Sequence, residues 1–191
     1  MHQELQQHIN HFITISSEEL NEVLQYFRPL QLKKKQNLLT EGSICKHNYF
    51  TAKGCLRLFF INEKGIEQTT QFAIENWWLA DYTSFEKQQP SSYNIQAVEK
   101  SDVLALSYTG QEKLLQQHPV MERYFRLMHQ RAHAAAQFRI KSLYSLSREE
   151  LYNIFSSAHP EFVQRIPQYL LASFLGFTPE YLSEIRRKTI S

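Results

Sequence analysis

Residues 168–188 read QYLLASFLGFTPEYLSEIRRK, and the spacing of small and apolar residues predicts two helices that cross at a tight turn. Two helices approach closely only where the first carries a small residue and the turn accepts a left-handed backbone. Ala172 and Gly176 meet these needs, four residues apart. Thr178 is suited to cap the second helix and Pro179 to begin it. The stretch therefore predicts a helix-turn-helix of the kind that reads DNA.

The second helix of this motif is expected to have a buried and a polar side. The residues predicted to be buried in the motif are Leu171, Leu175, Phe177, Leu182 and Ile185. The predicted DNA-contacting residues are Thr178, Pro179, Glu180, Ser183, Glu184, Arg186, Arg187 and Lys188. Two alternatives stay open: an ordinary helical hairpin, and a solvated helix face that touches no base.

Residue chemistry suggests a role for each polar side chain. Thr178 and the first-turn amides can hold a phosphate at the helix N-terminus. Glu180 can accept a hydrogen bond from a cytosine amino group, and Ser183 can bond either base type. Arg187 can reach a guanine or a phosphate. Arg186 and Lys188 are predicted to contact phosphates.

Composition limits the kind of protein. A chain of 191 residues with 42% apolar content can bury one or two cores. No apolar run is long enough to cross a bilayer, and the first residues, MHQELQQHINHF, do not form a secretory signal. Only two cysteines occur, Cys45 and Cys55, which suits a reducing compartment. We therefore expect a cytoplasmic protein with no membrane partner.

Charge is unevenly distributed along the chain. Residues 120–191 carry ten Lys and Arg against six Asp and Glu, whereas residues 1–119 carry eleven against thirteen. A modest basic excess in the C-terminal part suits a phosphate-binding surface but does not establish one.

The first part of the chain has two patterns. Ser17 is predicted to cap a helix that continues to Phe27. From about residue 33 to 107 the pattern is that of β-structure, most clearly in CLRLFFI, NEKG and IEQTTQF, residues 55–72. These form a predicted hairpin with Gly65 in its turn. Several short strands at near-regular spacing favour a small antiparallel barrel or roll.

A long helix is predicted from Val120 onward, because no Pro or Gly interrupts residues 120–146. One stripe runs through Met121, Phe125, Met128, Ala132, Ala135 and Arg139, and a second through Val120, Tyr124, Leu127, Ala134 and Phe138. Two stripes favour a helix that packs on its own barrel and also on the same helix of a second copy, in a parallel homodimer. The alternative is that both stripes pack within one subunit.

After this helix, Ser147 is predicted to cap a separate helix, REELYNIF. Residues 159–167, HPEFVQRIP, then lead to the helix-turn-helix, and we expect them to form a short β-wing.

The order of these elements resembles the Crp/Fnr family of bacterial transcription regulators, and GFTPEYLSEIRRK resembles that family's recognition helix. The resemblance implies an α+β fold: an N-terminal antiparallel β-roll like a cyclic-nucleotide-binding domain (residues 1–118), a long dimerisation helix (119–145) and a C-terminal winged helix-turn-helix (146–191). It implies a homodimeric transcription regulator that reads a near-palindromic site in double-stranded DNA. An activator would also contact RNA polymerase, but no such surface can be located in the sequence.

The chain departs from the family at the ligand pocket, where the family carries a Gly-Glu pair and an Arg-Ser or Arg-Thr pair. Ala80-Asp81 and Ser91-Ser92 align with these pairs, and Trp77 and Trp78 add apolar bulk. Asp81 can still accept ribose hydroxyls, but Ser91 cannot replace a guanidinium. Losing one buried charge pair costs about 2–5 kcal/mol. We therefore expect a degenerate pocket that does not respond to cyclic AMP, with no cofactor predicted and the effector unidentified.

Other chemistries find little support. An iron–sulfur cluster needs N-terminal cysteines, and none precedes Cys45. His47 is the only histidine of the β-region, which is too few for a metal-dependent barrel enzyme, and a lone histidine is a weak candidate for haem. His8 and His11 have helical spacing but no third ligand, which favours a tag-like or solvated face over metal. No catalytic residue and no metal site are predicted.

One rival function stays open, a ligand-sensing or protein-interaction module that does not bind DNA. Glu180 and Glu184 place negative charge on the predicted recognition helix. Glu184 also aligns with a position where the family often carries a guanine-reading arginine, so a DNA target would differ from that of such members.

Overall fold

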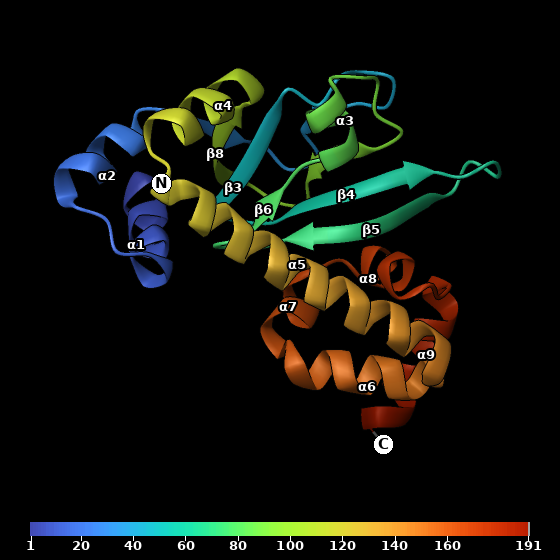
Figure 1. The fold of residues 1–191 in the computed structure, drawn as a ribbon. Coiled ribbons are helices and arrows are strands. Elements are labelled where there is room, and N and C mark those ends of the chain that lie inside the picture. The colour runs from blue at the N-terminus through green and yellow to red at the C-terminus, as the bar shows by residue number, and fades with distance from the viewer. Residues whose placement is uncertain (191) are drawn as a thin grey trace. The chain divides into compact units, whose positions relative to one another are not determined.

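The computed structural model describes residues 1–190, which form two compact units. The first unit contains Met1–Phe60 and Thr70–Gln130, and the second contains Ile61–Thr69 and the chain from Arg131 onward. Helix α5 (Val120–Ser145) and the hairpin of strands β4 (Leu56–Ile61) and β5 (Glu67–Ala73) contribute residues to both units. Figure 1 shows the antiparallel strands and the C-terminal helices, which confirm the predicted α+β class.

Two four-stranded sheets form the roll. The first has the order β1 (Phe27–Leu32), β8 (Ser101–Ser107), β3 (His47–Lys53) and β6 (Trp78–Leu79). The second has the order β2 (Asn37–Leu39), β7 (Asn94–Ala97), β4 and β5. Strand β8 runs antiparallel to β1 and β3, and β7 runs antiparallel to β2 and β4. The antiparallel pairing confirms the roll predicted from residues 33–107.

The predicted hairpin turn is confirmed at residues 62–65. Gly65 has a φ of 74°, a left-handed conformation that a glycine adopts without steric cost. The Asn62 carboxamide oxygen accepts the backbone N–H groups of Lys64 and Ile66, each at 3.0 Å. The turn is therefore held by a side chain three residues before the glycine.

Alternation along β8 separates two hydrophobic cores. Val103 and Ala105 belong to the core inside the roll, whereas Leu104 and Leu106 belong to a second core on the opposite face of the sheet. Successive side chains of a strand point to opposite faces, so one strand supplies both cores. The outer core is covered by α1 (His2–Phe12), α2 (Ser17–Leu24), α4 (Tyr108–Gln117) and the first turns of α5.

The N-terminal helices differ from expectation in three details. Helix α2 ends at Leu24, and Phe27, expected as the end of this helix, begins β1. Ser16, not Ser17, caps α2, because its hydroxyl accepts the backbone N–H of Glu19 at 3.1 Å. The stretch around His8 is not a tag-like segment, since α1 completely buries Leu5 and Ile9 in the outer core. Alternation of these buried residues with polar neighbours at helical spacing is the signal that could have revealed this.

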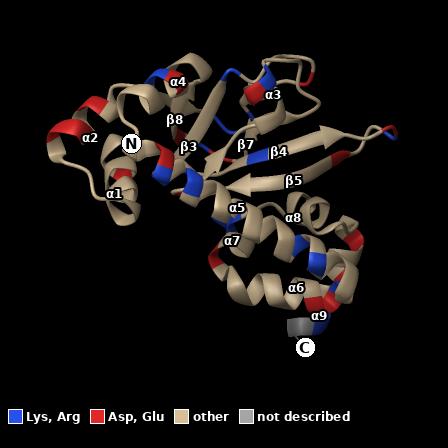
Figure 2. Ribbon diagram, in the orientation of Figure 1, with Lys and Arg blue, Asp and Glu red and all other residues tan. Residues whose placement is uncertain are grey.

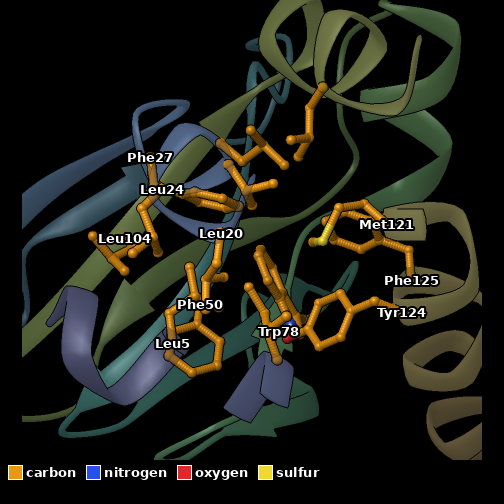
Figure 3. Close-up of a cluster of buried hydrophobic side chains, with 14 of the residues drawn as sticks. Leu5, Leu20, Leu24, Phe27, Phe50, Trp78, Leu104, Met121, Tyr124 and Phe125 are labelled. Atoms are coloured by element: carbon orange, nitrogen blue, oxygen red, sulfur yellow. Dashed lines mark hydrogen bonds between the residues drawn. The ribbon is translucent and has the colours of Figure 1, made fainter. Parts of the chain in front are cut away.

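Tyr124 of α5 is the polar centre of the outer core. Its side chain is completely buried, and its oxygen accepts the indole N–H of Trp78 at 2.9 Å. The same oxygen lies 2.7 Å from Nδ1 of His8. Figure 3 shows Tyr124 beside Trp78, Phe125 and Met121, within the cluster that includes Phe50. Burial raises the pKa of Tyr124, so the hydroxyl keeps its proton and can donate it to His8.

We expect Tyr124→Phe to lower the free energy of unfolding of the first unit by about 1–3 kcal/mol, because the substitution leaves the buried indole N–H of Trp78 without its acceptor and removes the bond to the half-buried His8. Denaturant unfolding followed by tryptophan fluorescence measures this, since both tryptophans, Trp77 and Trp78, lie in the first unit. Tyr108→Phe is the matched control, because among the described residues the half-buried Tyr108 hydroxyl has no hydrogen-bond partner. Equal stability of the two variants would contradict the role given to Tyr124.

The second unit contains the helices α6 (Arg148–Ala158), α7 (Pro160–Arg165), α8 (Gln168–Leu175) and α9 (Pro179–Ile190). The β-wing predicted at residues 159–167 is wrong, because this segment forms α7. Pro160 begins α7, where its fixed φ suits a helix, and Val163 and Ile166 are buried at helical spacing. Two prolines within nine residues also leave few N–H groups for a strand ladder.

Candidate nucleic-acid interface and sensor pocket

The turn between α8 and α9 has the geometry that the sequence predicts. Gly176 ends α8 with a φ of 76°, its N–H bonds the carbonyl of Ser173, and the N–H of Phe177 bonds that of Ala172. These two bonds form a Schellman motif, which requires a left-handed residue at the glycine. The Thr178 hydroxyl then accepts the N–H of Tyr181 at 3.3 Å, which confirms Thr178 as the cap of α9.

The inner side of the helix pair is buried as predicted. Ala172, Leu171 and Leu182 are completely buried, and little of Leu175, Phe177 or Ile185 is exposed. The small side chain of Ala172 allows the two helices to pack closely around the turn. The pair is therefore a compact motif with one face left for other contacts.

The outer face of α9 carries the predicted DNA-contacting residues. All of them are exposed except Arg186, which is half-buried: Thr178, Pro179, Glu180, Ser183, Glu184, Arg186, Arg187 and Lys188. The structure brings these side chains to one helix and one turn. The Ser183 hydroxyl donates to the carbonyl of Pro179 at 2.9 Å, which leaves its lone pairs available as acceptors.

Acidic side chains lie among the basic ones on this face. Lys188 Nζ lies 3.1 Å from a carboxylate oxygen of Glu184 and 3.7 Å from one of Glu149 on α6. Hydrogen bonding to Glu184 raises the pKa of Lys188. Figure 2 shows acidic and basic positions together on α6 and α9. Exposed ion pairs contribute little free energy. Lys188 can therefore leave these carboxylates and bind another anion.

Arg139 and Ser173 hold α8 in place, and the sequence analysis assigned neither of them this role. The Arg139 guanidinium donates to the carbonyl of Phe174 at 2.6 Å and lies 4.1 Å from the centre of its ring. A cation at the C-terminal end of a helix also complements the helix dipole. The Ser173 hydroxyl accepts the N–H of Thr69 and donates to the carbonyl of Glu67, each at 2.9 Å. A lone serine within the apolar stretch of α8 was the available signal.

We expect Arg139→Ala to lower the stability of α8 by about 1–3 kcal/mol, because a charged hydrogen bond and a cation–π contact are lost together. Amide hydrogen exchange of α8 measures this local stability. Lys141→Ala is the control, since Lys141 is exposed on the same helix. Unchanged protection of α8 in Arg139→Ala would show that the contact does not hold the helix.

In the sensor roll, Asp81 and Ser91 bond directly to each other. Asp81 Oδ2 accepts the Ser91 hydroxyl at 2.6 Å, and Oδ1 accepts the N–H groups of Thr83 and Ser84 at the start of α3 (Tyr82–Lys87). Both residues are buried, with 7% of Asp81 and 3% of Ser91 exposed. The carboxylate is therefore already hydrogen-bonded through both oxygens within the protein.

The other predicted pocket residues lie in different places. Ala80 is buried inside the roll, near Asp81 in the chain, whereas Trp78 belongs to the outer core on the opposite face of the sheet. Trp77 is 46% exposed, and Ser92 is also exposed. Of the six predicted residues, the structure thus shows direct contact between Asp81 and Ser91 and places the two tryptophans outside the interior of the roll.

The predicted dimer helix has two distinct parts. Met121 and Phe125 are buried in the outer core of their own chain, and Met128 packs against that core. Every side chain from 129 to 138 is exposed, which includes Ala132 and Ala135. Four large apolar residues follow with high exposure: Phe138, Ile140, Leu143 and Tyr144.

The remaining sequence candidates can be placed as well. His8 bonds to Tyr124, His11 is exposed, and His47 is half-buried at the start of β3. In the part of the chain that the structure describes, no three His, Cys, Asp or Glu side chains lie close enough to hold a metal ion. None of the helices described is both long and apolar enough to span a membrane.

Comparison with known proteins agrees with this architecture. Residues 29–118 match the family model of the cyclic nucleotide-binding domain. No curated protein sequence matches the chain significantly.

Several solved structures share the fold. The c-di-GMP responsive global regulator CLP of Xanthomonas campestris is 13% identical with a TM-score of 0.72, and the match covers 91% of each chain. FixK2 of Bradyrhizobium japonicum is 15% identical with a TM-score of 0.71, over 85% of this chain and 83% of that one. A Crp/Fnr family transcriptional regulator of Eubacterium rectale is 12% identical with a TM-score of 0.68, over 91% and 83%.

Residues 29–118 thus form a roll of the cyclic nucleotide-binding class. The whole chain has the fold of the Crp/Fnr regulators, which confirms the resemblance seen in the sequence.

Proposed function

We propose that the chain is a homodimeric transcription regulator that binds a specific site in double-stranded DNA and acts in the cytoplasm, without catalytic activity. The observation that carries this proposal is the capped α9, whose inner face is buried on α8 while its outer face is exposed and polar. The fold shared with Crp/Fnr regulators supports it.

The contacts proposed for α9 follow from its exposed groups. The hydroxyl of Thr178 and the first-turn amides suit a DNA phosphate, because a helix N-terminus favours anions. Glu180 and Ser183 are one turn apart and both offer acceptors, which suits the amino groups of cytosine or adenine in the major groove. Arg187 reads a base or a phosphate, and Arg186 and Lys188 hold the backbone.

Dimerisation is proposed to use the exposed part of α5. A helix that is exposed on all sides over ten residues gains little from tertiary packing, so a partner helix would stabilise it. Ala132 and Ala135 allow close approach, and Phe138 and Leu143 offer apolar surface beyond them. Met121 and Phe125 are engaged within their own chain and contribute to holding α5 on the roll.

Selection of bound sequences from random duplex DNA, with purified ligand-free protein, tests DNA reading. We expect enrichment of a palindrome whose half-sites lie about one helical turn apart. Arg187→Ala should weaken binding to the selected site by about 1–3 kcal/mol per half-site if Arg187 reads a base, or reduce the salt slope by about one unit per half-site if it holds a phosphate.

Lys113→Ala, an exposed substitution on α4 outside the interface, is the control and should bind as the unchanged protein does. Failure of any sequence to be enriched would leave two readings. One is an obligatory effector bound in the pocket of residues 77–92, and the other is the rival function, a protein-interaction module, which the paired Lys188, Glu184 and Glu149 on the same face would suit.

Cyclic AMP is not expected to bind this chain at physiological concentration or to change its DNA affinity. Ser91 supplies no cation for a cyclic phosphate, and it already bonds to the carboxylate that would accept ribose hydroxyls. Isothermal titration calorimetry with the full chain should show no binding of cyclic AMP at micromolar concentrations. Micromolar affinity would refute the degenerate pocket.

A further inference from the structure

A hollow of about 260 Å³ lies inside the roll of the first unit, and residues on or next to β1, β2, β3 and β8 line it. Its apolar lining includes Leu30, Leu39, Tyr49 and Ala105. None of its lining residues comes from the segment 77–92 that contains Asp81 and Ser91. The hollow adjoins this segment, because Ile44 pairs with Pro90 and the N–H of Cys45 donates to the Ser84 hydroxyl, but its lining is separate.

Strand register explains why space remains here. Ala105 of β8 is paired with Arg28 of β1 on one side and with Tyr49 of β3 on the other. Side chains at directly paired positions point to the same face of a sheet. The methyl group of Ala105 therefore lies between two long side chains and leaves the volume between them unfilled.

The rim of the hollow is positively charged. Arg28 and Lys46 are exposed, and neither side chain forms a hydrogen bond or ion pair with any residue in the described part of the chain. The pKa of His47 is lowered mainly by burial, and further by the positive charges of Arg28 and Lys46. No acidic residue lines the hollow, so this charge is not compensated at the site.

The deeper polar groups are satisfied within the protein. The Tyr49 hydroxyl donates to the carbonyl of Leu38 at 3.5 Å, and the Cys45 thiol donates to that of His47 at 3.4 Å. Burial also raises the pKa values of the Cys45 thiol and of Tyr49, so both stay uncharged. The floor therefore suits an apolar group, while the rim suits an anion.

We propose that this hollow binds a small organic acid, with its carboxylate at Arg28 and Lys46 and a short apolar chain against Leu30, Leu39 and Tyr49. Since one water occupies about 30 Å³ of liquid, the hollow holds about nine groups of that size. A saturated carboxylate of eight carbons has this size and polarity. The site lies wholly in the first unit and is independent of DNA binding.

Calorimetric titration of the full chain with octanoate tests the site, with 1-octanol as the uncharged ligand of equal length. We expect octanoate to bind at least about tenfold more tightly than octanol, because a charge-assisted contact is lost in the alcohol. From hexanoate to octanoate, affinity should rise by up to about fourfold per methylene, and decanoate should gain no more because the hollow is full.

Substitutions at two exposed residues locate the ligand. Arg28→Gln and Lys46→Gln should each weaken octanoate binding by about threefold or more while leaving octanol unchanged. Lys34→Gln is the matched control, because Lys34 is exposed and does not line the hollow. Ala105→Val should weaken both ligands by filling the space, with circular dichroism to verify the fold. No octanoate binding at millimolar concentration, equal binding of octanol, or indifference to both charge substitutions would each overturn the proposal.

Discussion

The first unit depends on the buried hydroxyl of Tyr124. This oxygen joins three elements that are far apart in sequence, because it bonds to His8 of α1 and Trp78 of β6 from its position on α5. The apolar cluster around it buries the indole of Trp78, so no solvent replaces the bond from this N–H, whereas His8 is half-buried. The first turns of α5 are thereby held on the outer face of the sheet. The part of α5 left for another partner begins only after Met128.

The interior of the roll is arranged around a buried carboxylate. Asp81 caps α3 and bonds to Ser91, so these two buried polar side chains satisfy each other. A buried carboxylate needs such partners, since an unpaired charge in the interior is costly. Uncompensated positive charge instead occurs at Arg28 and Lys46, at the rim of a different hollow.

Local signals predicted the C-terminal motif accurately, because each of them acts over a few residues. Gly176 adopts the left-handed conformation that ends α8, Thr178 caps α9, and Ser147 caps α6 together with Glu150. The error at residues 159–167 has the same local origin. Pro160 at a first helical position and the burial of Val163 at helical spacing favour a helix there, not the wing expected for this segment.

The sequence by itself determined the class of fold, the roll, the long helix and the residues of the helix-turn-helix, since periodicity, capping and turn chemistry are properties of neighbouring residues. Only the tertiary structure decided that the first turns of α5 are buried and the later ones exposed, that Trp77 and Trp78 lie outside the roll interior, and that Asp81 meets Ser91. It also decided that Ser173 and Arg139 hold α8, and that Ala105 opens a hollow between Arg28 and Tyr49. These contacts join residues that are distant in the chain. Strand register and packing bring them together, and no local pattern specifies either.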